Sequence, residues 1–73
     1  MKKITYQTVL EKARNKKCTI YSDVYDHPQD FFIVNTLSFG LITLNSDDKF
    51  YLMKDGQIEF KSLDDGDGFI KIH

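Results

Sequence analysis

The chain has 73 residues, of which 41% are hydrophobic, 14% aromatic and 29% charged, and its net charge is −1. This length predicts one domain over residues 1–73, near the lower limit for a self-sufficient hydrophobic core, and the apolar content excludes disorder. A single cysteine, Cys18, excludes an intramolecular disulfide. The start lacks the apolar region of a signal peptide, and no stretch reaches the roughly 18 apolar residues of a membrane span. We therefore expect a cytoplasmic protein without a membrane partner.

Charge is distributed unevenly along the chain. Residues 1–17 contain six basic residues and one acidic residue, whereas residues 18–73 contain four basic and ten acidic residues. This separation predicts a molecule with a basic region and an acidic region. Nine of the ten basic residues are lysine and alanine occurs once, a bias typical of AT-rich coding DNA that indicates a bacterial or phage origin.

Residues 5–17 have the spacing of an amphipathic helix. Four apolar residues recur at i, i+3, i+4 and i+7 and form one stripe: Tyr6, Val9, Leu10 and Ala13. Thr5 is a suitable N-cap, while a start at Thr8 would fit a capping box, so both starts stay open. Lys16 and Lys17, near the predicted end, suit the negative end of the helix dipole.

Beyond the helix, polar and apolar residues alternate with the period of two that is typical of β-strands. Residues 18–25 predict a first strand, which ends before Pro28. The apolar segment 31–44 is either one long bent strand or two short strands, 31–35 and 40–44. We prefer two strands, because strands usually run about five or six residues.

Residues 50–61 predict a β-hairpin, because an Asp-Gly pair lies between two alternating runs and favours a two-residue type I′ turn. This turn would pair Met53 with Ile58 and place both side chains on one face. Phe50 and Leu52 would then lie on the opposite face. The segments NSDDK and DDGDG, before and after the hairpin, have the composition of turns.

These elements predict an α+β fold. One N-terminal amphipathic helix packs on an antiparallel sheet of about five strands, arranged mostly as a meander. Several strands carry apolar residues on both faces, and one helix covers only one face of a small sheet. Either the sheet curls toward a partial barrel, or part of the second face stays exposed and marks a protein interface.

The segment DVYDHPQD gathers groups that bind metals or transfer protons: Asp23, Asp26, His27 and Asp30. A metal centre would need ligands from elsewhere in the chain, and only His73 is a candidate. A solvated loop explains the same residues, because aspartate is common in turns. We prefer the loop. A metal-dependent enzyme is therefore the weakest hypothesis, behind the protein-binding and nucleic-acid-binding functions described below.

Other signs of catalysis are missing from the sequence. Cys18 follows the helix C-terminus, where the helix dipole raises the pKa of a thiol, so we expect a small buried hydrophobic residue there. The chain contains no GxSxG, Walker or Rossmann pattern, and DDGDG lacks the ligand spacing of an EF-hand. We therefore expect no enzymatic activity, no cofactor and no bound metal.

The expected function is that of a small regulator or inhibitor that binds a protein partner, or a second copy of itself, and occludes the partner's surface. Turns at alternate positions of a meander meet at one end of the sheet, so their carboxylates should cluster and could dock on a basic groove. The residues expected to contact the partner are Phe50, Leu52, Asp47, Asp48, Asp64, Asp65 and Asp67.

Nucleic-acid binding by the basic helix is the alternative function. Four basic side chains could follow a phosphate backbone: Lys12, Arg14, Lys16 and Lys17. Only one of the four is an arginine, the residue best suited to bidentate phosphate contacts, and an acidic sheet nearby would repel phosphate. We therefore rank this function second.

Overall fold

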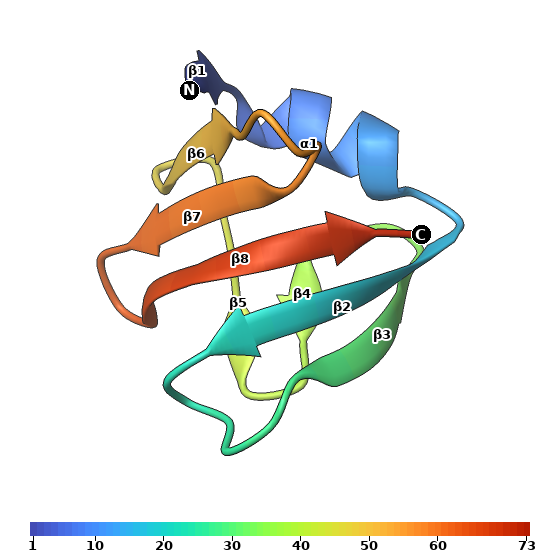
Figure 1. Cartoon of the computed structure of the whole chain (residues 1–73), viewed down its shortest axis with the longest axis vertical. Helices are drawn as coiled ribbons and strands as arrows, with labels where there is room; N and C mark the ends of the chain where they lie inside the picture. Colours follow the sequence, from blue (N-terminus) through green and yellow to red (C-terminus); the bar gives the residue numbers. More distant parts are fainter.

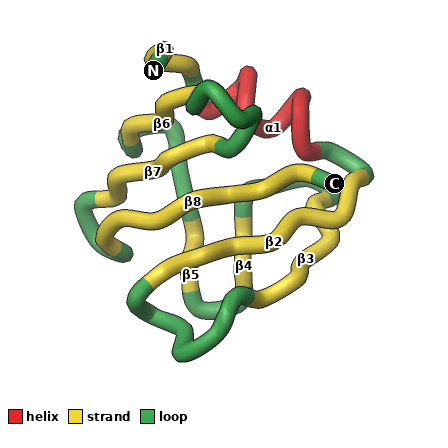
Figure 2. Tube along the Cα trace, viewed as in Figure 1, coloured by secondary structure: helices red, strands yellow, loops and turns green.

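The structure, a computed structural model, describes all 73 residues. It contains one helix and eight strands (Figures 1 and 2). In chain order the elements are β1 (Lys2–Ile4), α1 (Tyr6–Ala13), β2 (Lys16–Ser22), β3 (Gln29–Ile33), β4 (Ser38–Phe39), β5 (Ile42–Thr43), β6 (Lys49–Leu52), β7 (Ile58–Ser62) and β8 (Gly66–Ile72).

Six of the strands form one antiparallel sheet in the order β1-β6-β7-β8-β2-β3, and β4 and β5 form a separate hairpin. The edge strands β1 and β3 do not pair with each other, so the sheet is open and is not a closed barrel. The predicted α+β class is confirmed, with one N-terminal helix on an antiparallel sheet that includes the meander β6-β7-β8. The strands outnumber the expected five because residues 2–4 and 38–43 also form short strands.

The helix starts where one of the two predicted caps places it and ends earlier than expected. Thr5 is the N-cap, and its hydroxyl accepts a hydrogen bond from the Thr8 N–H at 3.2 Å. The chain leaves the helix at Arg14, and Asn15 has a φ of 61°, a left-handed conformation that asparagine tolerates better than most residues. The prediction that the helix extends to Lys17 is therefore wrong, because this turn redirects the chain into β2.

The hydrophobic core lies between the inner face of the sheet and the two elements that cover this face, α1 and the β4–β5 hairpin. α1 contacts β2 and β6, and Figure 1 shows β4 and β5 behind β8 and β2. The fourteen buried hydrophobic residues form one cluster: Val9, Leu10, Ala13, Cys18, Ile20, Ile33, Leu37, Phe39, Ile42, Leu44, Phe50, Ile58, Phe60 and Ile70. The segment after β3 thus performs the covering role that a second helix would otherwise take.

Residues 31–44 match neither predicted alternative in full. Their first part belongs to β3, as a separate short strand was expected to do. Their second part is not one strand, because the chain reverses at Gly40, where φ is 63°, and separates β4 from β5. The reversal puts Phe39 and Ile42 opposite each other, both fully buried.

The register of the β6–β7 hairpin differs by one residue from the prediction. The structure pairs Leu52 with Ile58, and Phe50 with Phe60, around a three-residue loop that ends at Gly56 with a φ of 84°. A shift of one residue moves every side chain of a strand to the other face. The prediction that Phe50 and Leu52 lie on an exposed face is therefore wrong: Phe50 is fully buried, and Leu52 packs against the core.

The outer face of the sheet is not covered by any other element. Its central row crosses four strands, because Tyr51 lies opposite Glu59, Glu59 opposite Phe69, and Phe69 opposite Tyr21. The four side chains are partly to substantially exposed. An antiparallel sheet with one solvated face normally presents polar residues there, so this aromatic row sets the face apart.

Candidate functional site

The strand pairings bring three acidic segments to one end of the sheet. Lys49, Lys61 and Asp67 share one cross-strand row, and Ser22 lies opposite Gly68. The chain therefore enters β6, turns from β7 to β8, and leaves β2 at the same end. Seven of the nine aspartates belong to this acidic end, as we call it: Asp23, Asp26, Asp47, Asp48, Asp64, Asp65 and Asp67.

Two of these aspartates also accept backbone hydrogen bonds, Asp48 within its own turn and Asp65 from β5. Asp48 Oδ2 accepts a hydrogen bond from the Asn45 N–H at 2.9 Å, and Asp65 Oδ2 accepts one from the Thr43 N–H at 3.2 Å. No aspartate of the acidic end forms an ion pair, since the one ion pair of the structure joins Lys17 to Asp30. No ion pair therefore neutralises these aspartates, although Lys49 and Lys61 lie in the cross-strand row at the same end.

A cleft of about 410 Å³ opens between the outer face of the sheet and the loop from β2 to β3. Two aromatic residues of the central row, Tyr21 and Phe69, line it together with Glu59. The remaining lining residues come from the loop and from the start of β8: Ser22, Asp23, Tyr25, Asp26, His27, Pro28, Asp67 and Gly68. The cleft thus combines aromatic surface with four carboxylates.

The loop that forms one wall of this cleft is fixed in place by Tyr25. The Tyr25 hydroxyl donates a hydrogen bond to the Phe39 carbonyl and accepts one from the Leu41 N–H at 2.8 Å. Its ring also packs against Phe31, with 6.1 Å between the ring centroids. These contacts fasten the loop to the β4–β5 hairpin, so the shape of the cleft is set by the fold.

The four residues that were weighed as a metal cluster are divided in the structure. Asp23, Asp26 and His27 line the cleft, whereas Asp30 lies in β3 and contacts Thr19 and Lys17. No group of three or more histidine, cysteine, aspartate or glutamate side chains is arranged to hold a metal ion. His73, considered as an additional ligand, lies beside Thr19 instead.

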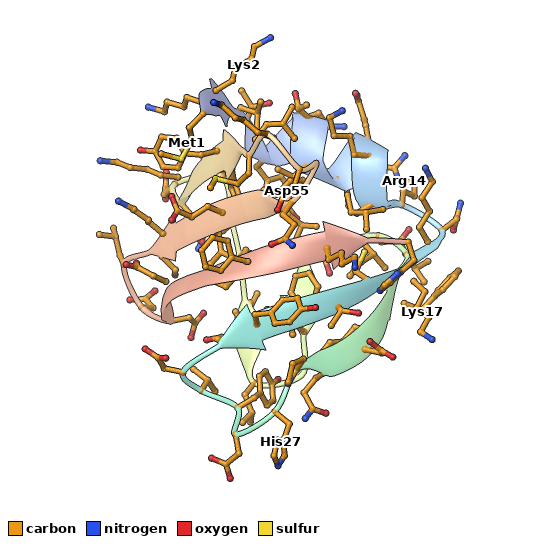
Figure 3. All side chains as sticks on the ribbon, in the orientation of Figure 1. Met1, Lys2, Arg14, Lys17, His27 and Asp55 are labelled. Carbon is orange, nitrogen blue, oxygen red and sulfur yellow. The ribbon has the colours of Figure 1, made fainter.

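The basic residues proposed for nucleic-acid binding gather at the opposite end of the molecule. Lys12 lies in the last turn of α1, Arg14 follows it, and Lys16 and Lys17 begin β2. Figure 3 shows Arg14 and Lys17 on one side of the molecule and His27 far from them. The side chain of Phe32, opposite Lys17 in β3, is 61% exposed. These four basic residues are therefore separated in space from the acidic end, whereas Lys3, which also belongs to the basic segment 1–17, lines a pocket with Asp47 and Asp48.

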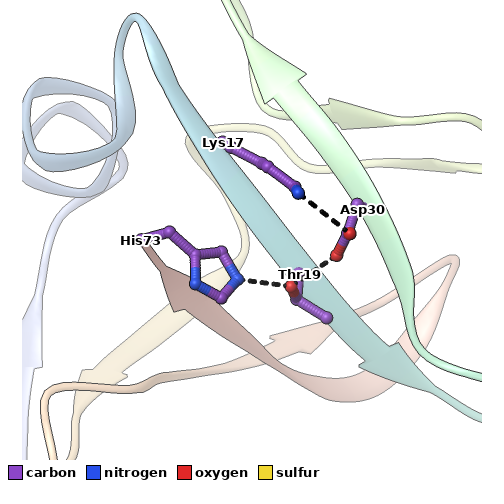
Figure 4. A network of polar contacts seen from close by, with 4 residues as sticks. All are labelled: Lys17, Thr19, Asp30 and His73. Atoms are coloured by element: carbon purple, nitrogen blue, oxygen red, sulfur yellow. Dashed lines mark hydrogen bonds and ion pairs between the residues drawn. The ribbon is translucent and has the colours of Figure 1, made fainter.

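A polar network on the outer face ties the C-terminus to β2 and β3 (Figure 4). The Thr19 hydroxyl donates to Asp30 Oδ1 at 2.6 Å and lies 2.6 Å from His73 Nε2, and Lys17 Nζ lies 3.4 Å from Asp30 Oδ2. The hydrogen bond from Thr19, helped by the charge of Lys17, lowers the pKa of Asp30. In a catalytic triad the carboxylate orients the imidazole, whereas here it contacts the hydroxyl, so the network does not have the arrangement of a triad.

Cys18 is fully buried in the core, as expected from the sequence. Burial is the main cause that raises the pKa of its thiol, and the charge of Lys16 opposes the shift. A buried thiol with a raised pKa is mostly protonated and a poor nucleophile.

The comparisons with known proteins add no relative. The chain matches no protein-family model, no curated protein and no solved structure. The one helix, eight residues long, lacks the length and apolar character that crossing a membrane would require.

Sequence reasoning identified the acidic turns but not the cleft beside them. Tyr21, Glu59 and Phe69 line that cleft, and none of them was among the predicted site residues. The correct hairpin register would have placed Glu59 on the outer face with Tyr51. The pairing of β8 with β2, which brings Phe69 beside Tyr21, joins segments almost fifty residues apart and leaves no local signal.

Proposed function

We propose that this protein is a small non-enzymatic binding module that docks its acidic end on a basic surface of a partner protein and occludes it. The observation that carries the proposal is the gathering of seven aspartates at one end, next to an aromatic and acidic cleft. Charged patches of this kind accelerate association with a surface of opposite sign and select against other partners.

The composition of the acidic end favours a protein partner over a simple counter-ion. Leu63, at the tip of the β7–β8 turn beside Asp64, has 89% of its surface exposed. An apolar side chain held at the tip of a turn gains free energy only when another apolar surface covers it. A metal ion or a soluble polyamine provides little such surface, whereas a basic protein groove provides both charge and apolar contact.

Phe50 has no part in this interface, because it is fully buried. Leu52 is half-buried against the core and offers little surface. The proposed contact residues are the five turn aspartates named from the sequence, to which the structure adds the cleft and Leu63. The five are Asp47, Asp48, Asp64, Asp65 and Asp67.

The proposal is tested by capturing partners from a nuclease-treated lysate with the wild-type protein and two variants. In the first variant the five aspartates become asparagine, which keeps the carbonyl oxygens that accept the turn hydrogen bonds. In the second, the four basic residues 12, 14, 16 and 17 become glutamine. We expect a basic protein that binds the wild type and the second variant and is lost with the first. A partner retained by the first variant would contradict the proposal.

Nucleic-acid binding at the basic end is the second candidate function. The observation in its favour is Phe32, an exposed aromatic ring beside Lys17, since rings of this kind stack on unpaired bases. Binding of a single-stranded oligonucleotide that weakens steeply with salt and disappears in the glutamine variant would support this function. Equal binding by the wild type and that variant would exclude it.

A further inference from the structure

We propose that the cleft beside β2 and β8 is an anchor site that takes one arginine side chain of the partner protein. This inference rests on the proposed function and specifies the group that the partner inserts. The cleft has a volume of about 410 Å³ and is open to solvent at the protein surface. Sites of roughly 300–1,000 Å³ commonly enclose small ligands, so a guanidinium group with part of its aliphatic stem fits.

The sheet wall of the cleft offers aromatic side chains on which a guanidinium group can stack. Tyr21 and Phe69 are cross-strand neighbours on the outer face of the sheet, and both line the cleft. The face of an aromatic ring attracts a cation that approaches within about 6 Å, and arginine stacks on it through its planar group. The outer face already holds one cation in this way, since Lys61 Nζ lies 5.8 Å from the centre of the Tyr51 ring.

The carboxylates of the cleft set the sign of the charge that it accepts. Glu59 lies next to Phe69 on the outer face, and Asp67 lies two residues before Phe69 on the same strand. Asp23 and Asp26 approach from the loop. None of the four forms an ion pair within the protein. Lys61 lies opposite Asp67 in the ladder between β7 and β8, so the other three carboxylates are the ones without a lysine across from them. His27 is the one basic residue in the lining.

Arginine fits this arrangement better than the other cations available to a protein. Its guanidinium stacks on an aromatic ring while its edge donates paired hydrogen bonds to a carboxylate. Lysine carries a compact, strongly hydrated charge without a flat face to stack. A divalent metal ion is disfavoured, because no three potential ligands in the structure are arranged to hold one.

The cleft is formed before any ligand arrives. The hydrogen bonds of Tyr25 hold the loop wall, and the sheet wall is part of the ladder between β2, β8 and β7. A preformed site avoids the free-energy cost of ordering a loop on binding. A single arginine should therefore bind measurably even when it is detached from a partner protein.

The test is a titration of the isotope-labelled full chain with Nα-acetyl-arginine amide, followed by NMR chemical shifts. We expect shifts centred on Tyr21, Glu59 and Phe69, and none from the matched neutral probe Nα-acetyl-citrulline amide. Glu59→Gln and Phe69→Ala should each weaken binding about tenfold, from loss of a charged hydrogen bond or a stacking surface. Asp55→Asn, at the opposite turn, is the matched control and should leave the affinity unchanged.

The outcomes separate this inference from the proposed function. Equal shifts with the citrulline probe, or arginine binding unchanged in Glu59→Gln, would overturn the assignment of the cleft. Because Glu59→Gln preserves the shape of the side chain, it provides the test even when Phe69→Ala does not fold. If the five aspartates prove essential for partner capture while the arginine titration is negative, the proposed function stands and the anchor site is wrong. If arginine binds in the cleft but no basic protein is captured, the proposed function is wrong and the site stands.

Discussion

Phe50 and Phe60 face each other across β6 and β7, and both rings are completely buried in the core. Tyr6, from the first turn of α1, packs edge-on against Phe50, with 6.2 Å between the ring centroids. This contact joins the helix to the hairpin and gives Phe50 a structural role. Phe50 therefore contributes to the proposed partner interface only by maintaining the fold.

Replacement of Phe50 by alanine should lower the free energy of unfolding by about 3–5 kcal/mol, because a large buried ring leaves a cavity. Phe32→Ala is the matched control, since that ring is mostly exposed, and its effect should stay within about 0.5 kcal/mol. Urea denaturation of the two variants measures the difference. Similar losses in both variants would contradict the observed register of the hairpin.

Gly68 should not tolerate any side chain. A Cβ atom at this position would lie 2.6 Å from the Phe60 ring and would also collide with the Tyr21 carbonyl oxygen. Gly68→Ala should therefore cost about 1–3 kcal/mol in stability, the usual range for overpacking.

The control for Gly68 is Gly66→Asn, at the first position of β8. Gly66 has a φ of 81° but no atom near its missing Cβ, and asparagine accepts positive φ at a smaller cost than most residues. Thermal unfolding should show a clearly smaller loss for Gly66→Asn than for Gly68→Ala. A larger loss for Gly66→Asn would contradict the claim that steric collision excludes a side chain at position 68.

The Thr19 network should make stability depend on pH in the acid range. The folded-state pKa of Asp30 is lowered from its ordinary value of 3.8, so its contribution is fully present above that value and is lost as pH falls through the folded pKa. Thr19→Val removes the hydrogen bond, so the free energy of unfolding of this variant should fall less steeply than that of the wild type below about pH 4. Thr36→Val, at an exposed position, is the control, and its free energy of unfolding should depend on acid pH as steeply as that of the wild type.

Cys18 should react slowly with a thiol reagent while the protein is folded. Burial both excludes the reagent and raises the pKa of the thiol, so the thiolate is scarce at neutral pH. The rate of labelling should rise with denaturant concentration in parallel with unfolding. Rapid labelling of the native protein would contradict the burial of Cys18.

The sequence predicted those features that depend on neighbouring residues. The apolar stripe of α1, its cap at Thr5 and the turn composition around residues 45–48 are all local, and the structure confirms them. The helix end was misjudged because Lys16 and Lys17 suit a helix C-terminus equally well, although Asn15 is itself a stop signal at a left-handed position. The hairpin register was missed because Asp-Gly also fits a three-residue loop with glycine at the left-handed position.

The candidate site could be predicted only in part, for a related reason. The aspartates are visible as turn residues, and the order of a meander places their turns at one end of the sheet. The cleft depends on β8 pairing with β2 and on Tyr25 reaching Phe39. Both contacts are set by the packing of the whole chain rather than by local propensity, so no local pattern predicted them.

The measurement that tests the account most directly is the affinity of the captured partner for the wild type and for the variant with asparagine at positions 47, 48, 64, 65 and 67. We predict that the wild type binds a basic protein at low salt, that this binding weakens as salt rises, and that the variant loses it while remaining folded. An unchanged affinity in the folded variant would contradict the claim that the acidic end is the binding surface.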